Sequence, residues 1–305
     1  MQETEMLLQE KWLNGREDKF MTLILDGVQK KYKHFDLDIS MEVQTGFVTG
    51  LIGKNGAGKS TTFKTILGLT RPERGMITLD GKDVSKLTAK ERQNIGVVLT
   101  DSGFSGYMTI RDIAAVMAAM YDAFDKENFL RQCEQFDLPL NQKIKEFSMG
   151  MRVKLKTLLA MSHDAKFLLL DEPTTGLDVV AREEILDMLR EYMKQGDRSI
   201  LISSHISSDL EGLCDDIYLC DDGRIVLHEE TDTLLDNYGV LKLREEQYQG
   251  LDTAHILAVK EGKYGYECLT DNKAYYLKKY PDYLVEKGSI DEVLTMMIRR
   301  DKGGK

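Results

Sequence analysis

The stretch GLIGKNGAGKSTTFKTIL, residues 50–67, decides the fold class of this chain. It runs from an apolar segment through a glycine-rich loop into a helical pattern that starts at Lys59. Residues 53–60 match G-x-x-x-x-G-K-[ST], in which glycines let backbone N–H groups close around phosphates and the next helix N-terminus adds positive charge. We expect Lys59 to reach the β- and γ-phosphates and the Ser60 hydroxyl to ligate Mg²⁺. The residues of this loop are Gly53, Lys54, Asn55, Gly56, Ala57, Gly58, Lys59 and Ser60.

Short apolar segments along the chain indicate the strands of a β-sheet. Their residues do not alternate with polar ones, which is typical of strands buried on both faces, so the sequence predicts an α/β fold. A helical spacing of apolar residues covers 179–196, and residues 216–229 look like a hairpin that turns at Asp222-Gly223. The strand-like segments are residues 46–52, 94–100, 166–171 and 199–204.

Changes of pattern along the chain predict its domains. Residues 22–230 form the α/β domain, and within it residues 101–163 look like a helical subdomain between two strands. Residues 1–21 form an N-terminal extension, and residues 231–305 a small accessory domain of short strands and a final helix. That helix opens with a capping box between Ser289 and Glu292.

The composition excludes several classes of function. The 305 residues carry a net charge of -10, which repels phosphodiester backbones, so we expect no nucleic acid as partner. The four cysteines show no metal-binding or paired spacing and are expected to be reduced thiols. No apolar run reaches the length of a membrane span and no signal peptide pattern is present, so we expect a chain that does not itself cross the membrane.

Two carboxylates and a histidine follow buried strands. Asp171 and Glu172 end the segment KFLLLDE, where burial is costly unless the charges are used. We expect Asp171 to hold Mg²⁺ through water and Glu172 to orient and deprotonate an attacking water. His205 ends the segment SILISSH, and carboxyl ends of neighbouring strands face one crevice, so it becomes a candidate γ-phosphate contact. The plainer alternatives are a surface turn before Pro173 and a structural histidine.

In this order the segments resemble the ATP-binding-cassette (ABC) ATPases over about residues 22–230. The resemblance rests on the phosphate loop 53–61, which adds Thr61, on the Walker B run 167–172, on the D-loop that ends at Asp178, and on His205 as the switch histidine. A GTPase would show an N/T-K-x-D motif, which DNKAY at residues 271–275 does not complete. The resemblance implies a P-loop NTPase fold with a RecA-like core, an antiparallel β subdomain, a helical subdomain and a small C-terminal α+β appendage. It also implies ATP and Mg²⁺ as cofactors and ATP hydrolysis as the activity.

Three positions depart from the usual motifs of this family or extend them. The signature L-S-G-G-Q is replaced by FSMGM at residues 147–151, which keeps Ser148 and Gly150 and has Met151 last. In the family this segment contacts the γ-phosphate bound by a partner chain, which implies a second ABC ATPase chain in a homodimer or, if this signature is weakened, in a heterodimer. Thr100 stands where the family has a glutamine, and Asp101 is expected to substitute for that glutamine at the metal. Tyr32 is placed like the family's aromatic residue that stacks on adenine.

Finer details resemble the YtrB-like branch of bacterial ABC ATPases, which are encoded beside GntR-type regulators. This resemblance implies an ATP-hydrolysing subunit, peripheral on the cytoplasmic face of the cell membrane, that powers a separate multi-pass permease. Export of a peptide, an antibiotic or a small molecule is the implied transport. The alternatives are a cassette ATPase that acts as a mechanical or assembly factor without a permease, and a switch in which residues 231–305 regulate or dimerise.

Overall fold

The computed structural model describes the backbone of residues 22–33, 35–100, 102–263 and 265–303. Its centre is a six-stranded sheet in which β9, β3, β8, β7 and β6 run parallel and β10 pairs antiparallel with β9. The predicted strands are confirmed, as is the hairpin that turns at Asp222-Gly223. In spatial order the strands are β10 (Arg224–Glu230), β9 (Asp216–Asp221), β3 (Val48–Ile52), β8 (Ser199–Ser204), β7 (Phe167–Asp171) and β6 (Ile95–Val98).

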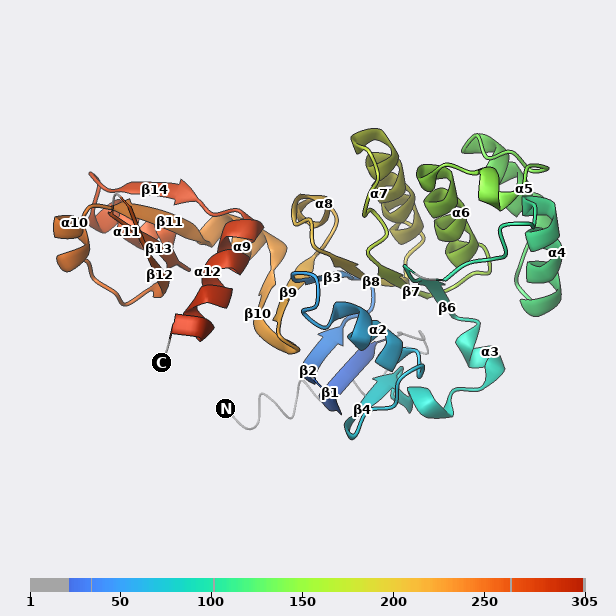
Figure 1. The fold of residues 1–305 in the computed structure, drawn as a ribbon, viewed down its shortest axis with the longest axis horizontal. Helices are drawn as coiled ribbons and strands as arrows, with labels where there is room; N and C mark the ends of the chain where they lie inside the picture. Colours follow the sequence, from blue (N-terminus) through green and yellow to red (C-terminus); the bar gives the residue numbers. More distant parts are fainter. Residues whose placement is uncertain (1–21, 34, 101, 264, 304–305) are drawn as a thin grey trace.

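The two faces of this sheet belong to different hydrophobic cores, which explains why its strands are apolar without alternation. Leu168 and Leu170 of β7 belong to the core under the helices, whereas Phe167 and Leu169 belong to the core shared with a second sheet. That second sheet is antiparallel, and its strands in spatial order are β2 (Asp36–Val43), β1 (Leu23–Lys31), β4 (Arg74–Leu79) and β5 (Lys82–Asp83). Helix α2 (Lys59–Ile66) lies between the two sheets, and Phe63 is fully buried there (Figure 1).

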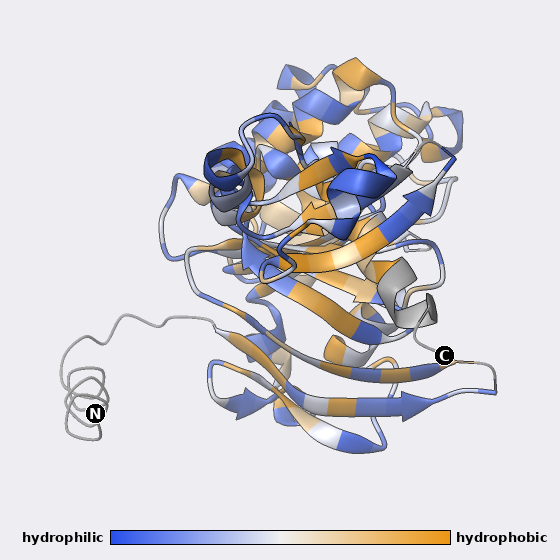
Figure 2. Cartoon of the chain, turned by 90° about the vertical axis from the view of Figure 1, so that its left-hand side faces the viewer, coloured by the Kyte–Doolittle hydropathy of each residue, from blue (hydrophilic) through white to orange (hydrophobic). Residues whose placement is uncertain are grey.

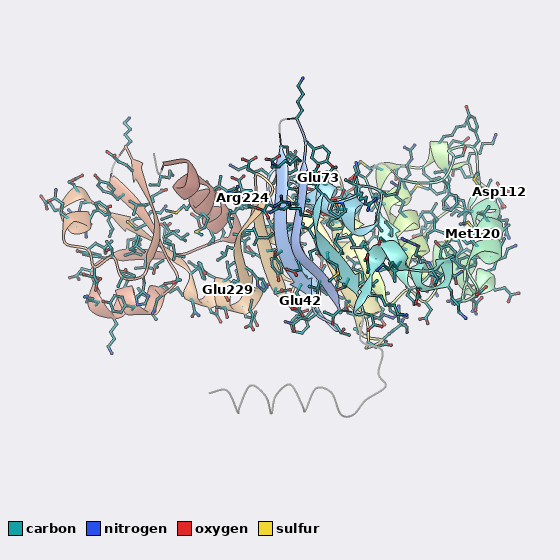
Figure 3. The ribbon with its side chains drawn as sticks, turned by 90° about the horizontal axis from the view of Figure 1, so that it is seen from below. Glu42, Glu73, Asp112, Met120, Arg224 and Glu229 are labelled. Atoms are coloured by element: carbon teal, nitrogen blue, oxygen red, sulfur yellow. The ribbon has the colours of Figure 1, made fainter. Side chains whose placement is uncertain are left out.

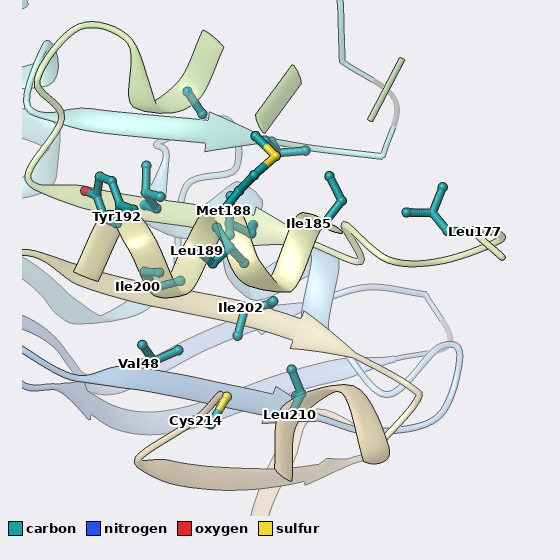
Figure 4. Close-up of a cluster of buried hydrophobic side chains, with 14 of the residues drawn as sticks. Val48, Leu177, Ile185, Met188, Leu189, Tyr192, Ile200, Ile202, Leu210 and Cys214 are labelled. Carbon is teal, nitrogen blue, oxygen red and sulfur yellow. The ribbon is translucent and has the colours of Figure 1, made fainter. Parts of the chain in front are cut away.

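Helices cover the other face of the central sheet. Figure 4 shows how α7 (Val179–Met193) places Ile185, Met188 and Leu189 over Ile200 and Ile202 of β8. Beside α7 lies α6 (Met149–Met161), which contacts α5 (Lys126–Gln135), and α5 in turn contacts α4 (Ile110–Met120). A 3₁₀ turn at Ile144–Glu146 precedes α6. Smaller elements are the 3₁₀ turn Val84–Lys86, α3 (Ala89–Arg92) and α8 (Ser208–Glu211). Seen from below, Glu42 and Glu73 mark the antiparallel sheet in the middle, and Asp112 and Met120 mark α4 at one end (Figure 3).

The C-terminal part forms a third sheet. Its strands in spatial order are β12 (Ile256–Gly262), β13 (Gly265–Thr270), β11 (Gly239–Leu243) and β14 (Leu284–Lys287), all antiparallel. The final helix α12 (Ile290–Gly303) starts at the predicted capping box, where Ser289 Oγ accepts from Glu292 N at 3.2 Å. Three further helices, α9 (Thr231–Asn237), α10 (Glu245–Gln249) and α11 (Lys273–Lys279), were not predicted. Figure 2 shows that hydrophobic residues gather along the strands of this chain.

Domain boundaries at about residues 22, 101, 163 and 231 stay a prediction. Residues 1–21 and Asp101 lie outside the described residues.

Candidate active site

The glycine-rich loop connects β3 to α2. Gly58 occupies the N-cap of α2 with a φ of +112°, and no side chain caps the helix or places an acid in its first turn. A Cβ on Gly53 would lie 2.3 Å from the backbone oxygen of Cys220, so the loop needs glycine there to pass close to β9. The free N–H groups at the start of α2 therefore remain available to an anion.

Lys59 links this loop to the end of β7. Its side chain is only 5% exposed, and Nζ donates to Gly53 O at 2.6 Å and to Lys54 O at 3.2 Å. The same Nζ lies 3.0 Å from Glu172 Oε1. A buried ammonium is stable only when it is paired, and in this structure the charge of Lys59 is paired with Glu172.

Glu172 leaves β7 in an unusual conformation and carries three side-chain contacts. Its φ is +54°, which is uncommon for a residue with a side chain. Oε2 accepts a hydrogen bond from Thr175 Oγ1 at 2.7 Å and one from His205 Nδ1. Burial acts to raise the pKa of Glu172, but hydrogen bonds from Thr175, Lys59 and His205 outweigh it and hold the pKa below its ordinary value. These hydrogen bonds therefore favour the ionised form of the carboxylate.

A pocket of about 510 Å³ opens beside these groups. It brings together eight predicted residues, and the described residues that line it also include Phe35, Thr100 and Thr175. The predicted members are Asn55, Gly56, Gly58, Lys59, Ser60, Thr61, Glu172 and His205. Gly53, Lys54 and Ala57 belong to the same loop but do not line the pocket, and Asp171 is buried at the end of β7.

The aromatic residue at the pocket is Phe35 rather than the predicted Tyr32. Tyr32 is 44% exposed and does not line the pocket, although its N–H donates to Phe35 O at 2.8 Å. A Cβ on Gly58 would lie 2.8 Å from Phe35 Cζ, so this ring rests on the phosphate loop. The sequence signal for Phe35 was its place at the start of a half-buried strand, three residues after Tyr32.

The remaining predicted residues form a second group, at the N-termini of α6 and α7. Ser148 is the N-cap of α6, and its Oγ accepts from Met151 N at 3.2 Å. Asp178 is the N-cap of α7, and its side chain accepts from Ala181 N at 2.9 Å. A Cβ on Gly150 would lie 3.4 Å from Ala181 Cβ, so the two helix starts are neighbours. None of Ser148, Gly150, Met151 and Asp178 lines the pocket.

Thr100, which the resemblance places at the position of the family's glutamine, lies at the pocket. Its Oγ1 donates to Asp171 O at 3.4 Å, a long hydrogen bond that ties this loop to the end of β7. Lys156 of α6 donates to Leu99 O and Thr100 O, both at 3.4 Å. The loop after β6 is thus held by both β7 and α6.

Comparison with known proteins decides the family. A family model described as "ABC transporter" matches residues 37–175. The ABC transporter ATP-binding protein NatA of Bacillus subtilis is 32% identical over 206 residues, covering 66% of this chain and 83% of NatA. This chain belongs to the ATP-binding proteins of ABC transporters. It is therefore an ABC ATPase, which binds and hydrolyses ATP.

Other relatives and a solved structure agree with this assignment. YtrB of Bacillus subtilis is 29% identical to this ABC ATPase over 224 residues, covering 73% of the chain and 74% of YtrB. The Nod factor export ATP-binding protein I of Burkholderia lata is 34% identical over 204 residues, covering 65% of this chain and 67% of that protein. A solved structure of an ABC transporter's ATP-binding subunit aligns with a TM-score of 0.62 at 27% identity, covering 70% of this chain and 91% of that one. The predicted fold class is thereby confirmed.

The donors of this ABC ATPase suit a hard cation that is shared with a bound nucleotide. Ser60 and Asp171 offer oxygen atoms, the ligand type that Mg²⁺ prefers. Among the described residues no group of three or more His, Cys, Asp or Glu side chains could hold a metal. Few protein ligands fit Mg²⁺ well, because in nucleotide sites it takes its other ligands from phosphates and water.

Within the same described residues, no helix combines the length and the apolar character that a bilayer span requires.

Proposed function

We propose that this ABC ATPase is the motor subunit of a transporter and drives a separate multi-pass membrane permease. The observation that carries the proposal is the chain of contacts from Lys59 through Glu172 to His205 at one pocket. The proposal includes export of a peptide, an antibiotic or a small molecule. The name of one relative, a Nod factor export ATP-binding protein, supports export. The protein would lie on the cytoplasmic face of the membrane.

In this proposal each side chain has one task. Lys59 leaves Glu172 and binds the β- and γ-phosphates, while the first turn of α2 donates backbone hydrogen bonds to them. Ser60 directly, and Asp171 through water, would hold Mg²⁺, which neutralises charge that develops on the phosphates. Glu172 orients an attacking water and takes its proton, and His205 contacts the γ-phosphate. Phe35 or Tyr32 stacks on the adenine.

A second ABC ATPase chain completes the proposed site. Ser148, Gly150 and Met151 would supply the N-terminus of α6 to the γ-phosphate of the partner, with Asp178 beside them. The partner is either an identical chain or a different cassette in a heterodimer. Residues 22–230 form the ATPase domain of the proposal, with the helical subdomain at about 101–163, and residues 231–305 form the accessory domain.

The permease is proposed to contact the chain near residues 100–121. Tyr107 is 72% exposed there, and Met120 is 61% exposed at the end of α4. The rival proposal, an assembly factor without a permease, requires no membrane partner. Fractionation of the native cells distinguishes them, because a permease subunit should retain the full chain in the membrane pellet.

Matched variants sharpen this experiment. Tyr107→Glu should release the chain to the supernatant while ATP binding is kept. Leu284→Glu, at another exposed apolar residue, should remain in the pellet, since Leu284 is 57% exposed but belongs to β14 of the C-terminal sheet. A wild-type chain that is found only in the supernatant would favour the assembly factor.

A further inference from the structure

Two consecutive serines end β8 directly before His205. Ser203 is 0% exposed and Ser204 is 1% exposed. A hydroxyl group is costly to bury unless it is hydrogen-bonded, so the partners of each serine indicate its task.

Ser203 contacts both acidic residues at the end of β7. Its Oγ donates to Asp171 Oδ1 at 2.7 Å and accepts from Glu172 N at 3.0 Å. The parallel register pairs Asp171 with Ser203, which places the hydroxyl beside the carboxylate. One buried oxygen atom therefore joins the side chain of Asp171 to the backbone of Glu172.

The same serine stabilises an unusual backbone. Glu172 has a φ of +54°, and such conformations persist where surrounding contacts hold them. The N–H of Glu172 has two acceptors, Ser203 Oγ and Ser203 O, the latter at 3.2 Å. Ser203 thus fixes the place where the chain turns away from β7.

Ser204 has a different task. Its Oγ accepts from Ile206 N at 2.9 Å and donates to Ile206 O at 3.1 Å, so it shapes the turn that carries His205. Ser204 thus hydrogen-bonds to Ile206, and Ser203 is the serine of the pair that contacts Asp171 and Glu172.

We propose that Ser203 is a positioning residue, which orients the Asp171 carboxylate toward the metal–nucleotide complex and fixes the backbone of Glu172. A carboxylate that accepts a hydrogen bond on one oxygen keeps the other oxygen and its orientation free for a metal-bound water. This inference rests on the proposed role of Asp171 in holding Mg²⁺, and it adds the residue that sets the geometry of that carboxylate.

The test compares nucleotide affinity with and without the metal, using the full chain. Trinitrophenyl-ATP fluorescence gives the affinity in MgCl₂ and in EDTA, and the ratio of the two affinities is the metal-dependent gain. Ser203→Ala should lose roughly tenfold or more of this gain, the usual effect of removing a hydrogen bond to a metal ligand, while its affinity in EDTA stays that of the wild type. Ser203→Thr keeps the hydroxyl and should recover most of the gain.

The matched control is Ser199→Ala. Ser199 lies at the other end of β8, is also 0% exposed, and its Oγ accepts one hydrogen bond, from Gly46 N at 3.1 Å. It should lower thermal stability without changing the metal-dependent gain. If Ser203→Ala does not fold, Ser203→Cys keeps the side-chain volume with a weaker donor and should show an intermediate loss.

The outcomes separate the inference from the proposed function. If both Ser203→Ala and Ser199→Ala keep the metal-dependent gain in nucleotide affinity of the wild type, the positioning role is overturned while the proposed function stands. An equal loss in both variants would also overturn it, because a general loss of structure would explain the result. A wild-type chain whose affinity is the same in MgCl₂ and in EDTA would overturn the proposed metal site, and the role of Ser203 with it.

Discussion

Replacing Glu172 with glutamine removes one negative charge and keeps the shape of the side chain. In the structure Oε1 lies 3.0 Å from Lys59 Nζ, and Oε2 accepts from Thr175 Oγ1 at 2.7 Å and from His205. A glutamine keeps one oxygen acceptor for Lys59 or Thr175, and its amide can donate to His205 Nδ1 if the proton moves to Nε2. The pocket should therefore keep its form.

Two magnitudes follow from these contacts. Loss of the base should lower hydrolysis at least ~10²-fold, which corresponds to about 2.7 kcal/mol in the activation barrier. Over 3.0 Å and at an effective dielectric constant of about 20, the attraction between Lys59 and Glu172 is roughly 5 kcal/mol before desolvation, which offsets much of it. Without this attraction Lys59 is freer to bind phosphates, so the affinity for ATP should be kept or increased.

The assay measures phosphate release and nucleotide binding for Glu172→Gln on the same protein sample. The control is Thr175→Val, which removes one hydrogen bond and leaves the carboxylate in place. We expect a loss clearly smaller than that of Glu172→Gln there, since the carboxylate keeps its contacts with Lys59 and His205. Turnover of Glu172→Gln within a few-fold of the wild type would refute the role of Glu172 as the base.

Three further outcomes test the site. Lys59→Ala should weaken ATP binding roughly 10- to 100-fold, because a charged donor to the phosphates is lost, and unchanged affinity by calorimetry would contradict the loop assignment. Light scattering of Glu172→Gln with ATP and Mg²⁺ should show a dimer that Ser148→Arg abolishes; a monomer in both would point to a different partner cassette. Phe35→Ala should lose roughly tenfold in ATP affinity and Tyr32→Ala much less, whereas the reverse order would restore Tyr32 as the stacking residue.

The fold could be predicted because its signals are local. The spacing of Gly53, Gly58 and Lys59 is dictated by contact between backbone and phosphate, and the buried strands are continuous apolar runs. Asp171, which ends β7, and Glu172, which follows it, are unusual enough after a buried strand to mark a site by themselves. The resemblance to ABC ATPases then supplied the roles, which spacing alone does not give.

What could not be predicted depends on how distant segments meet. Phe35 reaches the pocket because it directly precedes β2 and its ring lies against Gly58, whereas Tyr32 has the spacing expected from the family but is 44% exposed and does not line the pocket. Ser203 contacts Asp171 only because β7 and β8 pair in one particular register. In the C-terminal part, α11 contains Tyr275 and Tyr276, whose aromatic character favours a strand until tertiary packing is known.

The separation of the predicted residues into two groups argues for a second chain. The start of α6 presents Ser148 next to Met149, which is 55% exposed, and the start of α7 presents Val179 and Val180, which are 78% and 71% exposed. Such a group of apolar side chains beside a helix N-terminus is typical of a surface that a partner covers. A twofold axis would bring this surface of each chain to the pocket of the other, so one contact would complete both sites. Such a twofold arrangement would explain both the position of Ser148 at the start of α6 and the exposed valines of α7, and the light-scattering experiment tests it directly.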